Sequence, residues 1–113
     1  MNVREGMRTP WGKAQTVAML AEGIWMVETS GHGGIKLDRK RQNALPKAAR
    51  KQAAWYEEDV DALVPMLAFF DEVASKLSAS ATKVALAESL WNYEKVALAA
   101  LQAAGMAPAL PEA

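Results

Sequence analysis

The chain has no cysteine, only one histidine and no net charge over its 113 residues. Without cysteine, disulfides, thiolate metal sites and cysteine nucleophiles are excluded, and a reducing compartment is allowed. No apolar run approaches the roughly 18 residues of a membrane-spanning helix, and the first residues lack the apolar stretch of a signal peptide. We therefore expect a cytoplasmic protein with no membrane partner.

The zero net charge conceals two oppositely charged halves. Residues 1–51 carry ten Lys or Arg against four Asp or Glu, a net charge of +6, whereas residues 52–113 carry three Lys against nine acidic residues, a net charge of −6. Such halves attract each other in the fold or steer an oppositely charged partner. The apolar content of 51% and the four Trp are typical of a folded chain. The length predicts a single domain over residues 1–113, with frayed residues 1–8 and a flexible tail at 106–113.

Residues 15–37 predict a small antiparallel sheet. Strand-forming residues fill Gln15–Leu20 and Ile24–Thr29, and the short loop between them contains Gly23, which suits the positive φ of a hairpin. Ile35–Leu37 is expected as a third, short strand. Because a three-stranded sheet is stable only when something covers one of its faces, we expect an α+β fold in which this sheet packs against C-terminal helices.

Two helical segments are expected directly after the sheet. Asp38 is a predicted N-cap for a helix over Arg39–Leu45, since its carboxylate can accept a free backbone amide, and Pro46 stops that helix. A second helix is predicted to start at Pro46 and to lead into a longer helix containing Trp55–Asp59.

The last helix is predicted from about Thr82 to Ala104. Leu86, Leu90, Tyr93, Ala97 and Leu101 repeat at helical spacing, and Gly105 is a natural C-cap. This stripe predicts either core or the seam of a homodimer.

The loop Gly31-His32-Gly33-Gly34 is the first candidate for chemistry. Its glycines allow close approach of a ligand to the backbone, and the imidazole of His32 could serve as an acid, a base or a hydrogen-bond donor. The plainer interpretation is a tight turn between two strands. The glycine spacing matches neither the dinucleotide fingerprint nor the P-loop, and we predict no cofactor and no bound metal.

The stretch Trp55-Tyr56-Glu57-Glu58-Asp59 is the second candidate. If the chain is an enzyme, His32 with Glu58 and Asp59 would be its catalytic group, with a carboxylate of Glu57–Asp59 orienting the imidazole or sharing a divalent cation with it. The plainer interpretation is that both aromatic rings pack while the acids face solvent or pair with nearby arginines.

The basic segment Lys36–Lys51 is the third candidate. Arg39, Lys40 and Arg41 could contact phosphates, as in a DNA-binding regulator. Nucleic acid is the less favoured partner, because the pI is about 6.6 and no aromatic residues are interleaved with the basic ones.

Three motifs occur in a fixed order: Thr9-Pro10-Trp11-Gly12, Gly31-His32-Gly33-Gly34 and Trp55-Tyr56-Glu57-Glu58-Asp59. Together they resemble a small uncharacterised domain family encoded by phages and plasmids, with TPWG, SHGG-like and WYEED motifs. The resemblance covers residues 9 to about 70, and Gly31 departs from it because serine is expected there. It implies a mobile-element context and no established activity.

The leading hypothesis is a small phage or mobile-element protein that acts by protein–protein interaction on a bacterial host protein or complex, as an inhibitor of a defence system of the anti-CRISPR kind. Carboxylates are suitable mimics of phosphate charge in a groove meant for nucleic acid. The expected binding residues are Gly31, His32, Gly33, Gly34, Trp55, Tyr56, Glu57, Glu58, Asp59 and Asp61.

Overall fold

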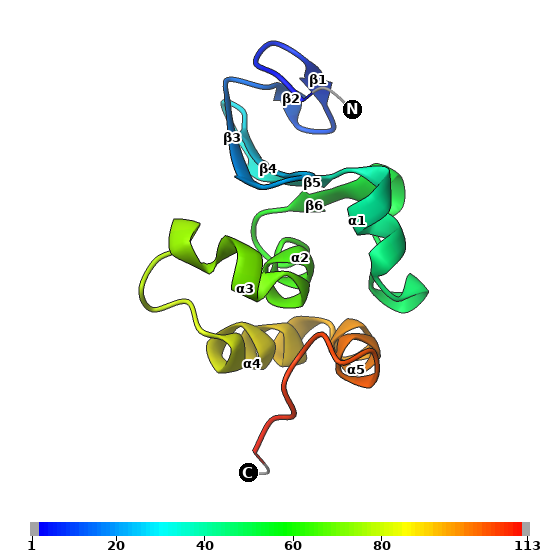
Figure 1. Cartoon of the computed structure of the whole chain (residues 1–113). Helices are drawn as coiled ribbons and strands as arrows, with labels where there is room; N and C mark the ends of the chain where they lie inside the picture. Colours follow the sequence, from blue (N-terminus) through cyan, green and yellow to red (C-terminus); the bar gives the residue numbers. More distant parts are fainter. Residues whose placement is uncertain (1–2, 112–113) are drawn as a thin grey trace.

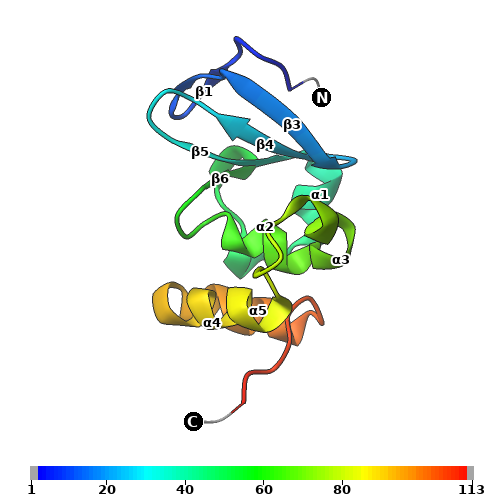
Figure 2. The ribbon, with the colours of Figure 1, turned by 90° about the vertical axis from the view of Figure 1, so that its left-hand side faces the viewer.

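The computed structural model of the chain describes residues 3–111. The described chain forms layers: a small N-terminal hairpin, a four-stranded sheet, a layer of short helices and a final pair of helices (Figures 1 and 2). The hairpin and the helices lie on opposite sides of the sheet. Among residues 3–111, no helix has both the length and the apolar content needed to cross a membrane.

The elements follow one another along the chain with short connections. The strands are β1 (Arg8–Thr9), β2 (Gly12–Lys13), β3 (Thr16–Ala21), β4 (Ile24–Glu28), β5 (Gly33–Leu37) and β6 (Trp55–Glu57). The helices are α1 (Arg39–Ala44), α2 (Leu63–Ala68), α3 (Phe70–Val73), α4 (Lys83–Tyr93) and α5 (Lys95–Ala103), with short 3-10 turns η1 (Lys47–Ala49), η2 (Gln52–Ala54) and η3 (Ala74–Lys76).

The main sheet is antiparallel, with the strand order β3-β4-β5-β6. Its first three strands confirm the predicted meander, and Gly23 has the expected positive φ of 80° in the β3–β4 hairpin. The α+β fold class and the packing of the sheet against C-terminal helices are likewise confirmed.

The fourth strand corrects the prediction that Trp55–Asp59 lies in a helix. The two 3-10 turns η1 and η2 replace the expected helix, and Ala53 and Ala54 have positive φ angles of 56° and 62°, which no α-helix permits. The chain then enters β6, where Tyr56 lies opposite Ile35 and Trp55 lies opposite Lys36. The alternation of a buried Tyr56 between two half-buried neighbours is that of a strand.

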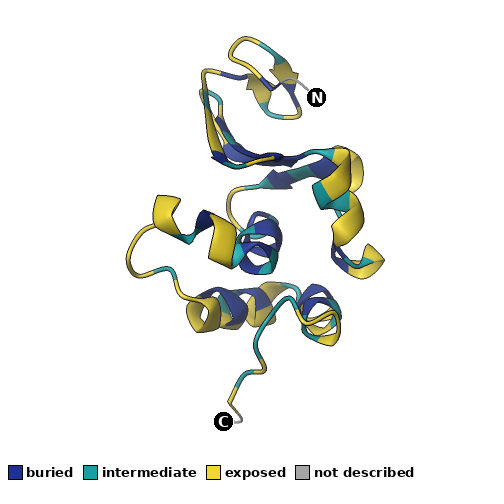
Figure 3. Cartoon of the chain, in the orientation of Figure 1, coloured by how far each residue is buried: buried dark blue, intermediate teal, exposed yellow. Residues whose placement is uncertain are grey.

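The two sides of the sheet differ in what covers them. On the helix-facing side, Ile24, Ile35, Leu37 and Tyr56 join the main core, together with apolar residues of α2, α4 and α5 (Figure 3). On the hairpin-facing side, Trp25, Val27 and the half-buried Trp55 form a second, smaller cluster with Val3, Met7, Ala14 and Val17. The strand alternation sends consecutive residues into two separate cores.

The N-terminal segment is tied to the hairpin. Gly6 N–H donates to Ala14 O at 2.8 Å, and Ala14 N–H donates to Met7 O at 2.9 Å. Val3 is buried in the smaller cluster. Residues 1–8 were expected to be frayed, but the segment 3–8 makes these contacts with the hairpin. Residues 1 and 2 lie outside the described part.

The last helical region is two helices, which corrects the expected single helix. The backbone breaks at Glu94 (φ −142°, ψ 69°), so α4 and α5 run in different directions (Figure 1). The break turns the Leu90 and Leu98 side chains into the same core and leaves Tyr93, expected in the buried stripe, 70% exposed. Thr82 caps α4 by accepting from Ala85 N–H at 3.1 Å.

After α5, the chain turns at Gly105, which has the positive φ of a C-cap glycine. Gln102 Nε2 donates to Pro108 O at 3.0 Å, and Leu110 packs against the main core. The predicted flexible tail over 106–113 therefore includes residues that contact the helices, and residues 112 and 113 lie outside the described chain.

Candidate functional site

The three sequence motifs meet on the hairpin-facing side of the sheet. Trp11, from the first motif, and Trp55, from the third, are in edge contact, with ring centroids 5.5 Å apart and planes at 85°. Gly34 of the second motif lies in β5 beneath Trp11, and an added Cβ there would come 2.6 Å from Trp11 Cη2 and closer still to the backbone oxygen of Tyr56. Only glycine allows the indole to lie this near the strand. This close packing gives Gly34 a structural reason that the sequence, which left open a ligand-approach loop or a tight turn, did not reveal.

Trp11 reaches the sheet because its turn is held by Thr9. The Thr9 hydroxyl donates to Gly12 O at 2.8 Å and accepts from Trp11 N–H at 3.0 Å. This turn presents Trp11 to the ring of Trp55, against which it packs.

Lys36 is a site residue that the sequence counted among surface charges. It is only 8% exposed, its Nζ lies 5.0 Å from the centre of the Trp55 ring, and it donates to Ala53 O. Burial lowers the pKa of Lys36, because desolvation penalises the ammonium form. The signal for its burial was its position between Ile35 and Leu37, in a strand with no solvated face.

Lys36 holds a strained piece of backbone. Ala53 and Ala54 both have left-handed φ angles, which cost an L-residue roughly 1–2 kcal/mol each. The hydrogen bond from Lys36 to Ala53 O fixes this segment directly before β6. Strained backbone of this kind often accompanies binding sites, and here it sets the position of Trp55.

His32 lies at the end of the sheet and pairs with Glu57. The Nδ1 to Oε2 distance is 3.6 Å, and the two side chains are 58% and 43% exposed. The loop is ordered by Thr29, whose N–H and hydroxyl both donate to His32 O, at 2.8 and 2.7 Å. The structure therefore brings His32 to a carboxylate of the third motif, and a pair open to water on both partners is a weak ion pair.

Glu58 and Asp59, which would complete a catalytic group, are placed differently. Glu58 is anchored by its backbone N–H, which donates to Gly33 O at 2.9 Å, and its carboxylate lies beside Gly33. Asp59 is exposed. Within residues 3–111, no ion pair joins either carboxylate to His32, and no three His, Asp or Glu side chains are grouped to hold a metal ion.

An open groove of about 420 Å³ runs beside Trp11 and Trp55 at the outer edge of β6. Its charged lining residues are Lys51, Glu57 and Asp61. Lys51 Nζ lies 3.1 Å from a Glu94 oxygen and 3.6 Å from an Asp61 oxygen. Burial alone would lower the pKa of Lys51, but these two carboxylates outweigh it and raise the pKa.

Most charged side chains of the basic segment Lys36–Lys51 bond to other residues of the domain. Arg41 makes a bidentate pair with Glu72 at 2.6 and 2.8 Å, which raises the pKa of Arg41 and lowers that of Glu72. Arg50 donates to two main-chain oxygens, and Lys51 is paired as described above. Of the predicted phosphate-contacting residues, Arg39 and Lys40 are exposed on α1.

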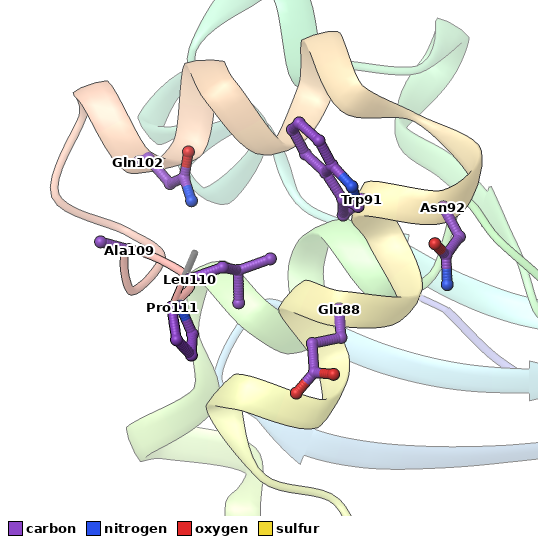
Figure 4. A pocket seen from close by; sticks show the side chains of 7 residues that line it. All are labelled: Glu88, Trp91, Asn92, Gln102, Ala109, Leu110 and Pro111. Carbon is purple, nitrogen blue, oxygen red and sulfur yellow. The ribbon is translucent and has the colours of Figure 1, made fainter. Parts of the chain in front are cut away.

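A second pocket lies far from the motifs, between α4, α5 and the C-terminal segment (Figure 4). Trp91 faces it from α4, Gln102 from α5 and Leu110 from the C-terminal segment, around a volume of about 610 Å³. Trp91 is 47% exposed, and Lys95 Nζ lies 4.8 Å from the centre of its ring. None of the motif residues reaches this pocket.

Comparison with protein families adds one match. A family model described as a domain of unknown function, DUF7007, matches residues 4–107. The chain belongs to the DUF7007 family. No curated protein and no solved structure matches the chain. The DUF7007 match includes the three motifs and extends over α4 and α5, which lie beyond the reach of the motif resemblance.

Proposed function

We propose that this DUF7007 domain is a binding protein that acts by protein–protein interaction, through the surface around Trp11, Trp55 and Glu57. The convergence of the three motifs supports this proposal most directly. Motifs separated by 20 or so residues along the chain meet where Trp11 packs on Gly34 and against Trp55. Half-buried tryptophans beside charged side chains are the residues that dominate protein interfaces.

The same geometry favours binding over catalysis. A general base needs a proton acceptor held in a site that excludes water, with its orienting partner in close contact. His32 and Glu57 are both exposed and 3.6 Å apart. The alternative of an enzyme using His32 with Glu58 and Asp59 has less support, and so does a DNA-binding regulator, because Arg41 and Lys51 are paired with carboxylates.

The partner that we propose is a protein or complex of a bacterial defence system, met in the cytoplasm of the host cell by a phage-encoded or plasmid-encoded inhibitor. The ordered motifs and their resemblance to mobile-element proteins support this context. Of the four carboxylates considered as phosphate mimics, Glu57 and Asp61 pair with His32 and Lys51, which leaves Glu58 and Asp59 exposed at the end of β6.

Two substitutions of the same residue type test which surface binds. Glu57 lines the groove beside the motifs, and Glu88 lines the pocket beside α4. Wild-type protein, Glu57→Lys and Glu88→Lys would be expressed in bacterial strains that each carry one defence system, and the plaquing of a targeted phage would be counted. We expect wild type and Glu88→Lys to restore plaquing against one system, and Glu57→Lys to lose at least tenfold of that effect. Equal activity of both variants would contradict the assigned surface.

The exposed α4–α5 end is a candidate for a homodimer contact. Trp91, Tyr93 and Val96 are large and exposed there. Light scattering of the purified protein over a hundredfold range of concentration distinguishes a monomer from a dimer, and Val96→Lys would shift a dimer to monomer if this end carries the contact.

A further inference from the structure

The outer edge of β6 carries two backbone groups with an unusual placement. In the antiparallel pairing with β5, Glu58 N–H donates to Gly33 O, and the register places Tyr56 opposite Ile35. Hydrogen-bonded and non-bonded pairs alternate along such a ladder, so the backbone of Tyr56 points inward to β5 while Trp55 and Glu57 point outward. The outward groups are the N–H and C=O of these two residues.

Two of these four backbone groups already make hydrogen bonds within the domain. Trp55 N–H donates to Gln52 O within the turn η2, and Ala62 N–H donates to Glu57 O at 2.9 Å. Trp55 C=O and Glu57 N–H remain, and no hydrogen bond among residues 3–111 involves them. They belong to an edge strand, because β6 ends the order β3-β4-β5-β6.

The remaining pair of groups can accept an added strand. In a parallel ladder, one residue of the added strand donates its N–H to the C=O of residue i−1 and accepts from the N–H of residue i+1. With Tyr56 as residue i, these are Trp55 C=O and Glu57 N–H. An antiparallel neighbour that faces Tyr56 in a non-hydrogen-bonded pair uses the same two groups, through two different residues of the added strand, so this edge can pair with a strand in either direction.

Charge distinguishes the possible occupants of this edge. Two copies of the chain that join β6 to β6 about a twofold axis would bring the carboxylates of Glu57, Glu58 and Asp59 of both copies together, and like charges repel. The occupant that complements this charge is a basic segment of a different protein. The groove beside the edge carries the carboxylates of Glu57 and Asp61, with Glu58 and Asp59 exposed nearby, against the single paired cation of Lys51.

We propose that the β6 edge binds an extended, basic segment of the partner protein by strand addition, with the partner main chain hydrogen-bonded to Trp55 C=O and Glu57 N–H and a Lys or Arg side chain beside Glu57. The proposal rests on the proposed binding function and names the mode in which the same surface binds. The main chain supplies the affinity and the carboxylates supply the preference for basic residues.

The decisive comparison is Glu57→Pro against Glu57→Ala. Both remove the carboxylate, but only proline removes the N–H, and proline is tolerated on an edge strand where that N–H faces outward. Tyr56 already has the extended backbone that a following proline requires. The probe is a phage-displayed library of random ten-residue peptides selected on the wild-type protein, followed by titration of the synthetic winners.

We expect the selected peptides to have alternating β-branched residues and a Lys or Arg. Their affinity for the protein should fall about threefold in Glu57→Ala and more than thirtyfold in Glu57→Pro. Peptides that bind Glu57→Pro and Glu57→Ala equally would overturn the proposal, and so would a failure to select any peptide. If Glu57→Pro does not fold, the amide hydrogen exchange of Glu57 in the wild type decides: slowing on addition of peptide supports the hydrogen bond from Glu57 N–H, and unchanged exchange refutes it.

The two proposals fail separately. Loss of the defence-related activity in Glu57→Lys together with equal behaviour of Glu57→Pro and Glu57→Ala would leave the binding surface in place and remove strand addition. An unchanged activity of Glu57→Lys would remove the surface itself.

Discussion

The two sides of the four-stranded sheet are built from alternate residues of the same strands, yet they differ in kind. The helix-facing side contributes Ile24, Ile35, Leu37 and Tyr56 to a core closed by two layers of helices. The hairpin-facing side has only residues 3–14 as a cover, and it carries a glycine in mid-strand, a buried lysine and both motif tryptophans.

The helix-facing side accounts for stability, and we propose that the hairpin-facing side accounts for the specificity of binding. Aliphatic side chains that fill a closed core stabilise the fold without choosing a partner. The features on the hairpin-facing side cost free energy: a desolvated ammonium at Lys36 and left-handed backbone at Ala53 and Ala54. These costs support the proposal that the binding surface lies on the hairpin-facing side.

The largest effect is expected on the helix-facing side. Ile35 is fully buried beneath the helices, and Ile35→Ala removes three methylene equivalents and leaves a cavity. We expect a loss of about 4 kcal/mol in the free energy of unfolding, measured by urea denaturation. Val27→Ala, at a fully buried position on the other side, is expected to cost about 2 kcal/mol. The reverse order would show that the smaller cluster is the tighter core.

A smaller loss is expected at the glycine beneath Trp11. In Gly34→Ala, the new methyl group meets Tyr56 O and Trp11, so the indole must leave the sheet or the strands must separate. We expect a loss of about 2–3 kcal/mol in urea denaturation and a red shift of the tryptophan emission. Gly31→Ala is the control, since an added Cβ there meets nothing within 4 Å and should change stability by less than about 0.5 kcal/mol. Equal losses in both variants would argue against close packing of Trp11.

The contrast between the two glycines also shows what the sequence could predict. The glycines of the second motif signalled a place where bulk is excluded, but of the predicted loop Gly31–Gly34 only Gly31 and His32 lie between the strands, since β5 begins at Gly33. The sequence could not show that Gly34 lies inside a strand under an indole ring, because the ring comes from a turn more than 20 residues away. Long-range packing leaves no local pattern.

The prediction of a helix at Trp55–Asp59 was wrong for a related reason. Alanine-rich residues before it and three acids in a row favour helix locally. The open edge of β5 and the hydrogen bond of Lys36 to Ala53 O overrode this preference. The break of the last helix at Glu94 also brings in a residue distant in the sequence, because Lys51 Nζ lies 3.1 Å from the Glu94 carboxylate.

Lys36 gives a pH-dependent difference between the two sides. Its pKa is lowered in the folded state, so between that pKa and the ordinary value of 10.5 the unfolded chain binds more protons. In this window the free energy of unfolding must rise with pH, by at most about 1.4 kcal/mol per pH unit. The raised pKa values of Tyr56 and Lys51 act in the opposite sense, but only from about pH 10 upward.

Urea denaturation of wild type and Lys36→Met at pH 8, 9 and 10 measures this effect. We expect stability to rise toward pH 10 in the wild type and to stay flat in Lys36→Met. Lys40→Met, an exposed lysine on α1, is the control and should keep the wild-type slope. A wild-type curve without a slope would mean that the Lys36 ammonium is not desolvated in solution.

The smallest change in stability is expected for a substitution of Ala53. Its sign, a gain or a loss, tests whether the backbone there is left-handed. The left-handed φ of 56° costs alanine roughly 1 kcal/mol or more, and glycine adopts it freely, although glycine loses more entropy on folding. We expect Ala53→Gly to stabilise the domain by about 0.5 kcal/mol in urea denaturation. Ala48→Gly, at an exposed position in η1 with ordinary φ, should destabilise it by about 0.5–1 kcal/mol. If both variants lose stability alike, Ala53 is not held in the left-handed conformation, and the edge of β6 would not begin where Trp55 C=O can face a partner.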